Sequence, residues 1–258
     1  MAALKVFITG ASSGIGQSLA HEYARQGATL GLVARRQELL LSLKNNLGVE
    51  NATYVADVRD EEALNKAAQH FMLQHGVPDI VISNAGVSSG TLTENKTDTA
   101  IFKAIIDINL IGMVNTFQPF LSAMKKEKKG SLVGIASIAG VRGLPGAGAY
   151  SASKAAVIAY LESLRVELNS DGLTVTTIAP GYIKTPMTDL NRFSMPFLMA
   201  PEVAAKKFSK AIKKKKKFII FPWQMRWVAI IMRTIPAWLW DLMMKNAPRK
   251  TRAQWDWL

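Results

Sequence analysis

Tyr150 and Lys154 stand four residues apart in the stretch YSASK, within a segment that has the apolar spacing of a helix. This spacing places both side chains on one helix face, one turn apart. A free tyrosine titrates at about pH 10, and a neighbouring ammonium favours the phenolate. We therefore expect Lys154 to lower the pKa of Tyr150, so that the phenol can act as a general acid or base.

Two polar residues precede this pair and extend the chemistry. Ser137 follows a predicted strand, where its hydroxyl can hold a carbonyl oxygen beside the phenol. Asn109, in DINLIG, lies in the middle of a predicted helix, where an amide side chain is locally unfavourable. We expect Asn109 to hold a water linked to Lys154. The candidate catalytic residues are Asn109, Ser137, Tyr150 and Lys154.

A glycine-rich turn, TGASSGIG, follows the first predicted strand and opens the first predicted helix. Such a turn lets the backbone approach a pyrophosphate, and the helix N-terminus offers free N–H groups to the negative charge. Its position matches that of a dinucleotide site, although a glycine-rich turn without a ligand is the alternative. The contacts expected here are Gly10, Ser12, Ser13, Gly14, Ile15 and Gly16.

The end of the second predicted strand bears on the choice of cofactor. An acid there would bind both ribose hydroxyls of NAD, but the sequence reads VARR, with Arg35 and Arg36. Because a guanidinium suits a phosphate, this favours NADP(H). We expect Arg35 to make the contact and leave the role of Arg36 open, since either arginine can simply begin a solvated helix.

Two further strand ends complete the predicted cofactor site. ADV places Asp57 and Val58 beside the adenine, and NAG supplies small residues where the ribose and pyrophosphate approach. The NAG contacts are Asn84, Ala85 and Gly86.

Apolar runs alternate with amphipathic stretches along the chain. Runs that are apolar on both faces and separated by helices indicate a parallel sheet covered on both sides, and right-handed crossovers make it doubly wound. We predict strands at residues 4–9, 28–33, 52–56, 80–83, 131–136, 174–179 and 217–221. Helices are predicted at residues 15–26, 37–47, about 60–75, 99–126 and 149–169, and near 201–212.

The sequence resembles the short-chain dehydrogenase/reductase superfamily over about residues 4–212. The matching motifs, in the family's order, are TGASSGIG, NAG, Asn109, Ser137, the Tyr150–Lys154 pair and PGYIKT. The resemblance implies a Rossmann-like sheet of about seven strands in the order 3-2-1-4-5-6-7. It also implies hydride transfer between NAD(P) and a carbonyl or alcohol. The family's basic residue before the second motif glycine is missing, because Ser13 stands there.

The resemblance assigns a role to each matching residue. Tyr150 would be the general acid in ketone reduction, and Ser137 would orient the carbonyl. Lys154 would bind the nicotinamide ribose and lower the tyrosine pKa, and Asn109 would hold a proton-relay water. The carboxamide would lie against Thr185 and the Ile183 backbone. The remaining contacts expected in PGYIKT are Pro180 and Gly181.

The segment 181–200 is the expected lid over the substrate. It holds apolar residues that suit a lipophilic carbonyl, unless they pack within the lid itself. These residues are Met187, Phe193, Met195, Phe197, Leu198 and Met199.

The net charge of +13 is concentrated at the C-terminal end. Residues 206–258 hold 14 of the 32 Lys and Arg residues and two of the 19 acidic ones. We predict one catalytic domain, residues 1–221, followed by an apolar, basic extension, residues 222–258. Lys213–Lys217 would occupy a turn before the last strand. Beyond it lie two tryptophan-bearing helical segments, interrupted by charges and prolines and therefore too broken to span a bilayer.

Three interpretations of the extension remain open. It lies on an anionic membrane surface, it packs in a subunit interface or against the enzyme's own substrate cleft, or it binds nucleic acid. Positive charge beside tryptophan favours the membrane surface, and apolar stripes favour packing against protein. The absence of a nucleic-acid motif and the near-neutral charge of residues 1–205 argue against nucleic acid. We expect a homodimer or homotetramer. The chain has no cysteine, no predicted metal site and no N-terminal signal-peptide pattern, so we expect a cytoplasmic protein with peripheral membrane contact.

The leading functional hypothesis is an NADPH-dependent reductase of a lipophilic ketone or aldehyde. The first alternative is a 3-oxoacyl reductase that acts on chains carried by an acidic protein and docks through the lysines of residues 206–258. The second is a nucleotide-binding interaction protein that keeps the fold without turnover.

Overall fold

Seven parallel strands form one sheet in the order β3-β2-β1-β4-β5-β6-β7, as predicted. The computed structural model describes residues 3–252. Every residue of β2 and β4 is buried, because helices cover both faces of the sheet. The strands are β1 (Lys5–Thr9), β2 (Thr29–Ala34), β3 (Asn51–Val55), β4 (Ile80–Ser83), β5 (Gly130–Ile135), β6 (Leu173–Pro180) and β7 (Phe218–Phe221).

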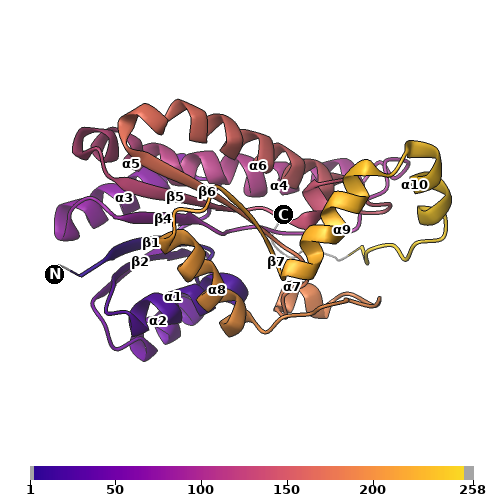
Figure 1. Ribbon diagram of the computed structural model, residues 1–258. Helices are drawn as coiled ribbons and strands as arrows, with labels where there is room; N and C mark the ends of the chain where they lie inside the picture. The colour runs from indigo at the N-terminus through magenta and orange to yellow at the C-terminus, as the bar shows by residue number, and fades with distance from the viewer. Residues whose placement is uncertain (1–2, 253–258) are drawn as a thin grey trace.

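The helices form two layers (Figure 1). The strand order reverses between β1 and β4, and in such a sheet ligands bind beyond the carboxyl ends at the reversal. One layer holds α3 (Glu61–His75), α4 (Asp98–Ile106), α5 (Gly112–Glu127) and α6 (Gly148–Glu167). The opposite layer holds α1 (Gly14–Arg25), α2 (Gln37–Asn46) and α8 (Pro201–Lys213).

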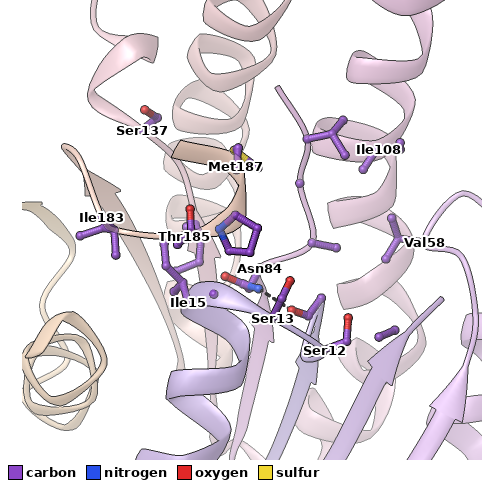
Figure 2. Close-up of a pocket in the computed structure, with 18 of the residues that line it drawn as sticks. Ser12, Ser13, Ile15, Val58, Asn84, Ile108, Ser137, Ile183, Thr185 and Met187 are labelled. Carbon is purple, nitrogen blue, oxygen red and sulfur yellow. Dashed lines mark hydrogen bonds between the residues drawn. The ribbon is translucent and has the colours of Figure 1, made fainter. Parts of the chain in front are cut away.

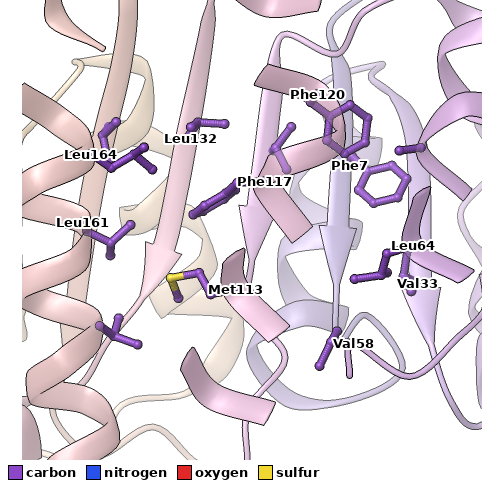
Figure 3. Close-up of a cluster of buried hydrophobic side chains, with 14 of the residues drawn as sticks. Phe7, Val33, Val58, Leu64, Met113, Phe117, Phe120, Leu132, Leu161 and Leu164 are labelled. Atoms are coloured by element: carbon purple, nitrogen blue, oxygen red, sulfur yellow. The ribbon is translucent and has the colours of Figure 1, made fainter. Parts of the chain in front are cut away.

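The core beneath α3, α5 and α6 fixes the helix that carries the candidate catalytic pair (Figure 3). The Phe7 ring packs edge-on against Phe71 and Phe120, with centroids 5.5 and 4.8 Å apart. On α6, Leu161 lies so close to β5 that a Cβ added at Gly134 would stand 2.4 Å from its Cδ1. The absence of a side chain at Gly134 therefore lets α6 approach the sheet closely.

The predicted helix at residues 99–126 is interrupted by a π-helical turn, η1 (Asp107–Ile111), between α4 and α5. π-Turns widen a helix locally and are frequent at functional sites. This turn contains Asn109, whose side chain is fully buried. The helix predicted at residues 99–126 is therefore present, and the π-turn within it is a feature that the sequence did not predict. The remaining short elements are η2 (Ile138–Gly140), η3 (Asn169–Asp171) and α7 (Pro186–Asp189).

The extension forms two helices, α9 (Trp223–Thr234) and α10 (Ala237–Met244), which are bent by 118° relative to each other. The Arg142 guanidinium donates hydrogen bonds of 2.6 Å to the carbonyls of Met232 and Ile235. It also lies 4.6 Å from the centroid of the Trp240 ring. One arginine of the main domain therefore fixes the junction of the two helices.

The lysine run occupies the predicted place: Lys213 ends α8, and the other four lysines lead to β7. The expected division into a domain, residues 1–221, and an extension, residues 222–258, remains a prediction. Residues 1–2 of the domain and 253–258 of the extension lie outside the described part of the chain.

Candidate active site

A cavity opens beyond the carboxyl ends of the central strands, at the reversal of strand order (Figure 2). Ser12 and Ser13, from the turn after β1, lie at one end of it, and Ser137, which follows β5, lies at the other (Figure 2). Sequence segments far apart in the chain therefore meet in one elongated site.

The glycine-rich turn has the backbone that its sequence predicts. Gly10 and Gly14 have φ values of +67° and +56°, which favour glycine. A Cβ on Gly16 would stand 2.2 Å from the Gly10 carbonyl oxygen, so Gly16 permits close packing of α1 on the turn. Of the predicted cofactor contacts, Gly16 alone does not line the cavity.

The N-terminus of α1 faces this end of the site with uncapped N–H groups. The first N–H groups of a helix lack intrahelical acceptors, and the Ser13 side chain does not cap them. They can therefore receive a negatively charged group, as a pyrophosphate requires.

Asn84 ties the glycine-rich turn to the end of β4. Its backbone N–H donates to the Thr9 hydroxyl at 3.3 Å, and its side-chain amide donates to the carbonyls of Thr9 and Gly10 at 3.2 and 3.1 Å. Asn84, Ala85 and Gly86 all line the cavity, as expected. Asn84 therefore positions the turn as well as lining the site.

Two arginines lie at the far end of the cavity. Arg36 Nη2 donates to the hydroxyls of Ser12 and Ser13 at 3.2 and 2.7 Å, whereas Arg35 Nη1 lies 3.5 Å from Asp57 Oδ2. Arg36, whose role was left open, therefore lies directly on the glycine-rich turn. Both arginines line the cavity together with Asp57 and Val58.

The Asp57 carboxylate is held in its charged form. Burial raises its pKa, but hydrogen bonds and charge from Arg59, with the charge of Arg35, outweigh burial and lower the pKa. Arg59 donates to Asp57 through its backbone N–H and its guanidinium, both at 2.9 Å. Asp57 therefore orders the arginines around this end of the site.

Tyr150 and Lys154 project from α6 at the opposite end, as their spacing predicted. Lys154 is almost fully buried, its ammonium donates to the Ile135 carbonyl at 2.8 Å, and it lies 5.9 Å from the centroid of the Tyr150 ring. Burial lowers the pKa of Lys154 to about 8. Ser137 lines the same part of the cavity.

The expected lowering of the Tyr150 pKa is wrong. Burial raises the pKa of Tyr150, and the side-chain hydrogen bond with Ser137 opposes this only in part. The physical reason is that burial removes the water that would stabilise the phenolate.

Asn109 lies behind the cavity and is not among its lining residues. Its amide donates to the Val87 carbonyl at 3.0 Å and to the Ser153 hydroxyl at 2.9 Å, and its oxygen accepts from the Val87 N–H at 2.8 Å. These bonds join the segment after β4 to α6. They assign Asn109 a positioning role, and the water-holding role remains a prediction.

The segment after β6 closes one side of the cavity. Thr185 caps α7, and the Thr188 hydroxyl donates to the Ile183 carbonyl at 2.7 Å, which fixes the loop that carries the expected carboxamide contacts. Pro180, Gly181, Ile183 and Thr185 all line the cavity.

Sequence reasoning missed several lining residues. Most lie at, or immediately after, the carboxyl ends of strands, and that position is the signal that could have identified them. They are Val33, Ala34, Arg36, Ala56, Val87, Ile108, Ile135, Ala136, Pro186, Met187 and Thr188, of which Met187 was expected only in the lid.

The predicted apolar lid contributes less to this cavity than expected. Met187 lines it, but Met199 is buried in the core, and Phe197 and Leu198 remain exposed by 50% and 45%. Phe193 packs on Tyr182, with ring centroids 6.2 Å apart. Part of the apolar set therefore packs within the lid itself, which is the alternative considered from the sequence.

The sequence matches a known protein family and several of its members. A family model described as short chain dehydrogenase matches residues 4–194. An uncharacterized oxidoreductase of Myxococcus xanthus is 36% identical over 237 residues, which cover 91% of this chain and 93% of that protein. An 11-beta-hydroxysteroid dehydrogenase-like protein of Arabidopsis thaliana is 35% identical over 240 residues, covering 90% and 77%.

A solved structure is similar to this chain in fold. The crystal structure of a 3-oxoacyl-(acyl-carrier protein) reductase from Brucella melitensis is similar to this chain with a TM-score of 0.75 and 25% identity. The similarity covers 84% of this chain and 89% of that one.

Proposed function

The chain belongs to the short-chain dehydrogenase family, and from this premise we propose that it transfers a hydride between NADPH and a lipophilic ketone or aldehyde, or catalyses the reverse oxidation. The observation that carries the proposal is one cavity with two arginines beside the glycine-rich turn at one end and Ser137, Tyr150 and Lys154 at the other.

The catalytic end suits proton transfer to a carbonyl oxygen. NADPH, when bound, would supply the hydride for the carbonyl carbon. Tyr150 donates the proton to the carbonyl oxygen while Ser137 orients that oxygen. Lys154 would bind the ribose hydroxyls beside the phenol, and the Ile183 backbone and Thr185 would hold the carboxamide. After turnover the phenolate takes a proton from solvent.

The preference for NADPH rests on charge at the other end of the cavity. Arg35 and Arg36 line it, and the Arg36 guanidinium already bonds to the hydroxyls of Ser12 and Ser13. No acid follows β2 to accept hydrogen bonds from an unmodified ribose. A ribose phosphate between the two arginines would receive charge-assisted hydrogen bonds.

The lipophilic substrate rests on Met187 in the cavity and on the exposed apolar residues of the lid. A relative named as hydroxysteroid dehydrogenase-like supports a substrate of this kind. The test is NADPH oxidation over a series of medium- and long-chain carbonyls with small polar ketones as the comparison. Higher kcat/KM for the apolar members is expected, whereas activity on small polar ketones alone would refute the substrate class.

A second candidate, reduction of 3-oxoacyl chains held by an acidic carrier protein, is favoured by the similarity to the Brucella melitensis reductase. The exposed lysines before β7 would then be the docking patch. In this case turnover of the carrier-bound substrate would fall as salt rises, because surface charges are screened. Equal turnover at low and high salt would argue against it.

We also propose that α9 and α10 lie on an anionic membrane surface. Trp223, Trp227 and Trp238 are exposed by 66%, 61% and 69%. Arg226 and Arg233 are exposed on the same helix as the first two. Basic residues beside tryptophan suit the interface of an anionic leaflet.

A surface position suits these helices better than a spanning one. They reach the length and composition of a membrane span only as a pair, and the pair is bent by 118°. The helix at Asp98–Glu127 passes the same test by length and composition, but half of that window is buried and it covers the sheet. Assembly into a homodimer or homotetramer is part of the proposal, and light scattering measures it.

A further inference from the structure

The chain returns from α10 to the carboxyl edge of the sheet through residues 245–252, here termed the return segment (Figure 1). Three contacts attach it to the loops around the catalytic end. The Gly90 N–H donates to the Thr251 carbonyl at 3.0 Å, and the Thr251 hydroxyl donates to the Leu190 carbonyl at 3.5 Å. Arg252 Nη2 donates to Asp98 Oδ1 at 2.5 Å.

The surfaces under the return segment are shaped to receive it. A Cβ added at Gly90 would stand 2.2 Å from the Lys250 carbonyl oxygen, and one at Gly146 would stand 2.9 Å from Arg249 Cβ. Asp98 is only 3% exposed, and its second oxygen accepts the Leu92 N–H at 2.8 Å. Two glycines and the ion pair between Arg252 and the buried Asp98 carboxylate therefore fix the position of Lys250.

This position brings the Lys250 ammonium to 5.6 Å from the centroid of the Tyr150 ring. Lys250 is largely buried, and burial lowers its pKa to about 8. Within residues 3–252, the structure shows no hydrogen-bonding or ion-pair partner for its ammonium. Lys154, the other cation at this ring, differs because it donates to the Ile135 carbonyl.

A largely buried ammonium without an anion is unfavourable, and an anion brought to it gains a charge-assisted hydrogen bond. We infer that Lys250 is a specificity-determining residue that binds an anionic group, a carboxylate or phosphate, carried by the carbonyl substrate a few bonds from the reacting carbon. This inference rests on the proposed function, since it places the anion beside the carbonyl that Tyr150 protonates. The remainder of the substrate is apolar.

The test compares α-oxooctanoate with its neutral amide, α-oxooctanamide, as substrates for NADPH oxidation. The wild type is expected to have kcat/KM roughly tenfold or more higher for the acid, the size of a hydrogen bond between charged groups. Lys250→Met should remove that preference by lowering the value for the acid alone. Lys250→Arg should retain most of it.

The matched control is Lys245→Met, which removes the same charge from an exposed position of the return segment. It should leave the preference unchanged. A wild-type enzyme that reduces acid and amide equally, or a Lys250→Met variant that keeps the preference, overturns the inference. Circular dichroism establishes that each variant is folded.

A calorimetric titration separates this inference from the proposed function. If no carbonyl is reduced, the proposed function fails, and binding of α-oxooctanoate to the protein with NADP⁺ still tests Lys250. Binding about tenfold weaker in Lys250→Met than in Lys245→Met supports the site. Equal binding in the two variants refutes it.

Discussion

Tyr150 is subject to opposing influences at its phenol. Burial raises its pKa, whereas its hydrogen bond with Ser137 lowers it. The net increase keeps the phenol protonated at neutral pH, which suits a proton donor in carbonyl reduction. Lys154, with a pKa of about 8, is a cation at neutral pH and loses its proton at alkaline pH.

A pH profile of activity follows from the lowered pKa of Lys154 and the raised pKa of Tyr150. Lys154 is charged below about pH 8 and neutral above it, while Tyr150 stays protonated through the same range. We therefore expect kcat/KM for NADPH to be constant at neutral pH and to fall as pH rises through about 8, as the ribose contact of Lys154 loses its charge. An increase through the same range would contradict these roles.

Arg36 provides a second prediction at this scale. Its guanidinium lies on the hydroxyls of Ser12 and Ser13, where a ribose phosphate would add charge-assisted bonds. Arg36→Ala should lower kcat/KM for NADPH by roughly tenfold and leave that for NADH nearly unchanged. Lys44→Met, an exposed change on α2, the helix that follows Arg36, is the control. An equal loss of kcat/KM with NADPH and NADH would show that Arg36 does not bind the ribose phosphate.

At the scale of elements, the site depends on close approaches that single glycines permit. Gly90 lies against the Lys250 carbonyl, whereas a Cβ at Gly143 would meet no atom within 4 Å. Gly90→Ala should therefore displace the return segment while Gly143→Ala should not. We expect faster tryptic cleavage after Lys245, Arg249 and Lys250 in the first variant only. Equal cleavage in both would contradict the described packing.

Regular elements were predictable because their signals are local. The apolar runs of β2 and β4, the glycine-rich turn and the Tyr150–Lys154 spacing each identify their element from a few neighbouring residues. The strand order came with the family resemblance. The π-turn at Asn109 was not visible, because the apolar pattern runs on through α4 and α5 without a break.

The missed parts of the site depend on contacts between distant residues. Arg36 and Arg35 are adjacent in sequence, and only the fold decides that Arg36 bonds to Ser13 while Arg35 faces Asp57. The position of Lys250 beside Tyr150 joins residues 100 positions apart. The pKa of Tyr150 was misjudged because the extent of burial is a property of the packed molecule.

For the whole molecule, charge and apolar exposure coincide in the extension. Met225 and Ala229 are buried on one side of α9, while Trp227 and Ile231 are exposed by 61% and 55% on the other. Residues 1–205 are nearly neutral by comparison, with 18 Lys and Arg residues against 17 Asp and Glu residues. An orientation with α9 and α10 toward an anionic leaflet therefore matches both properties.

Vesicle flotation tests this orientation. The wild type should float with phosphatidylglycerol-containing vesicles and much less with phosphatidylcholine alone. The double variant Trp227→Ser/Ile231→Ser should bind roughly tenfold more weakly, because it removes exposed apolar area. Leu73→Ser removes an 81% exposed leucine on α3 and serves as the control. If the double variant instead splits an oligomer and no form floats, the face is a subunit interface.

The most direct test of the central claim is NADPH oxidation by Tyr150→Phe with a long-chain carbonyl that the wild type reduces. The change removes one hydroxyl from α6 and leaves the arginine end of the cavity intact. We predict a loss of kcat of roughly 100-fold or more, the typical contribution of a general acid, with an unchanged Kd for NADPH. Retention of wild-type turnover by Tyr150→Phe, or NADPH binding by the wild type without turnover of any carbonyl, would contradict the proposed catalysis.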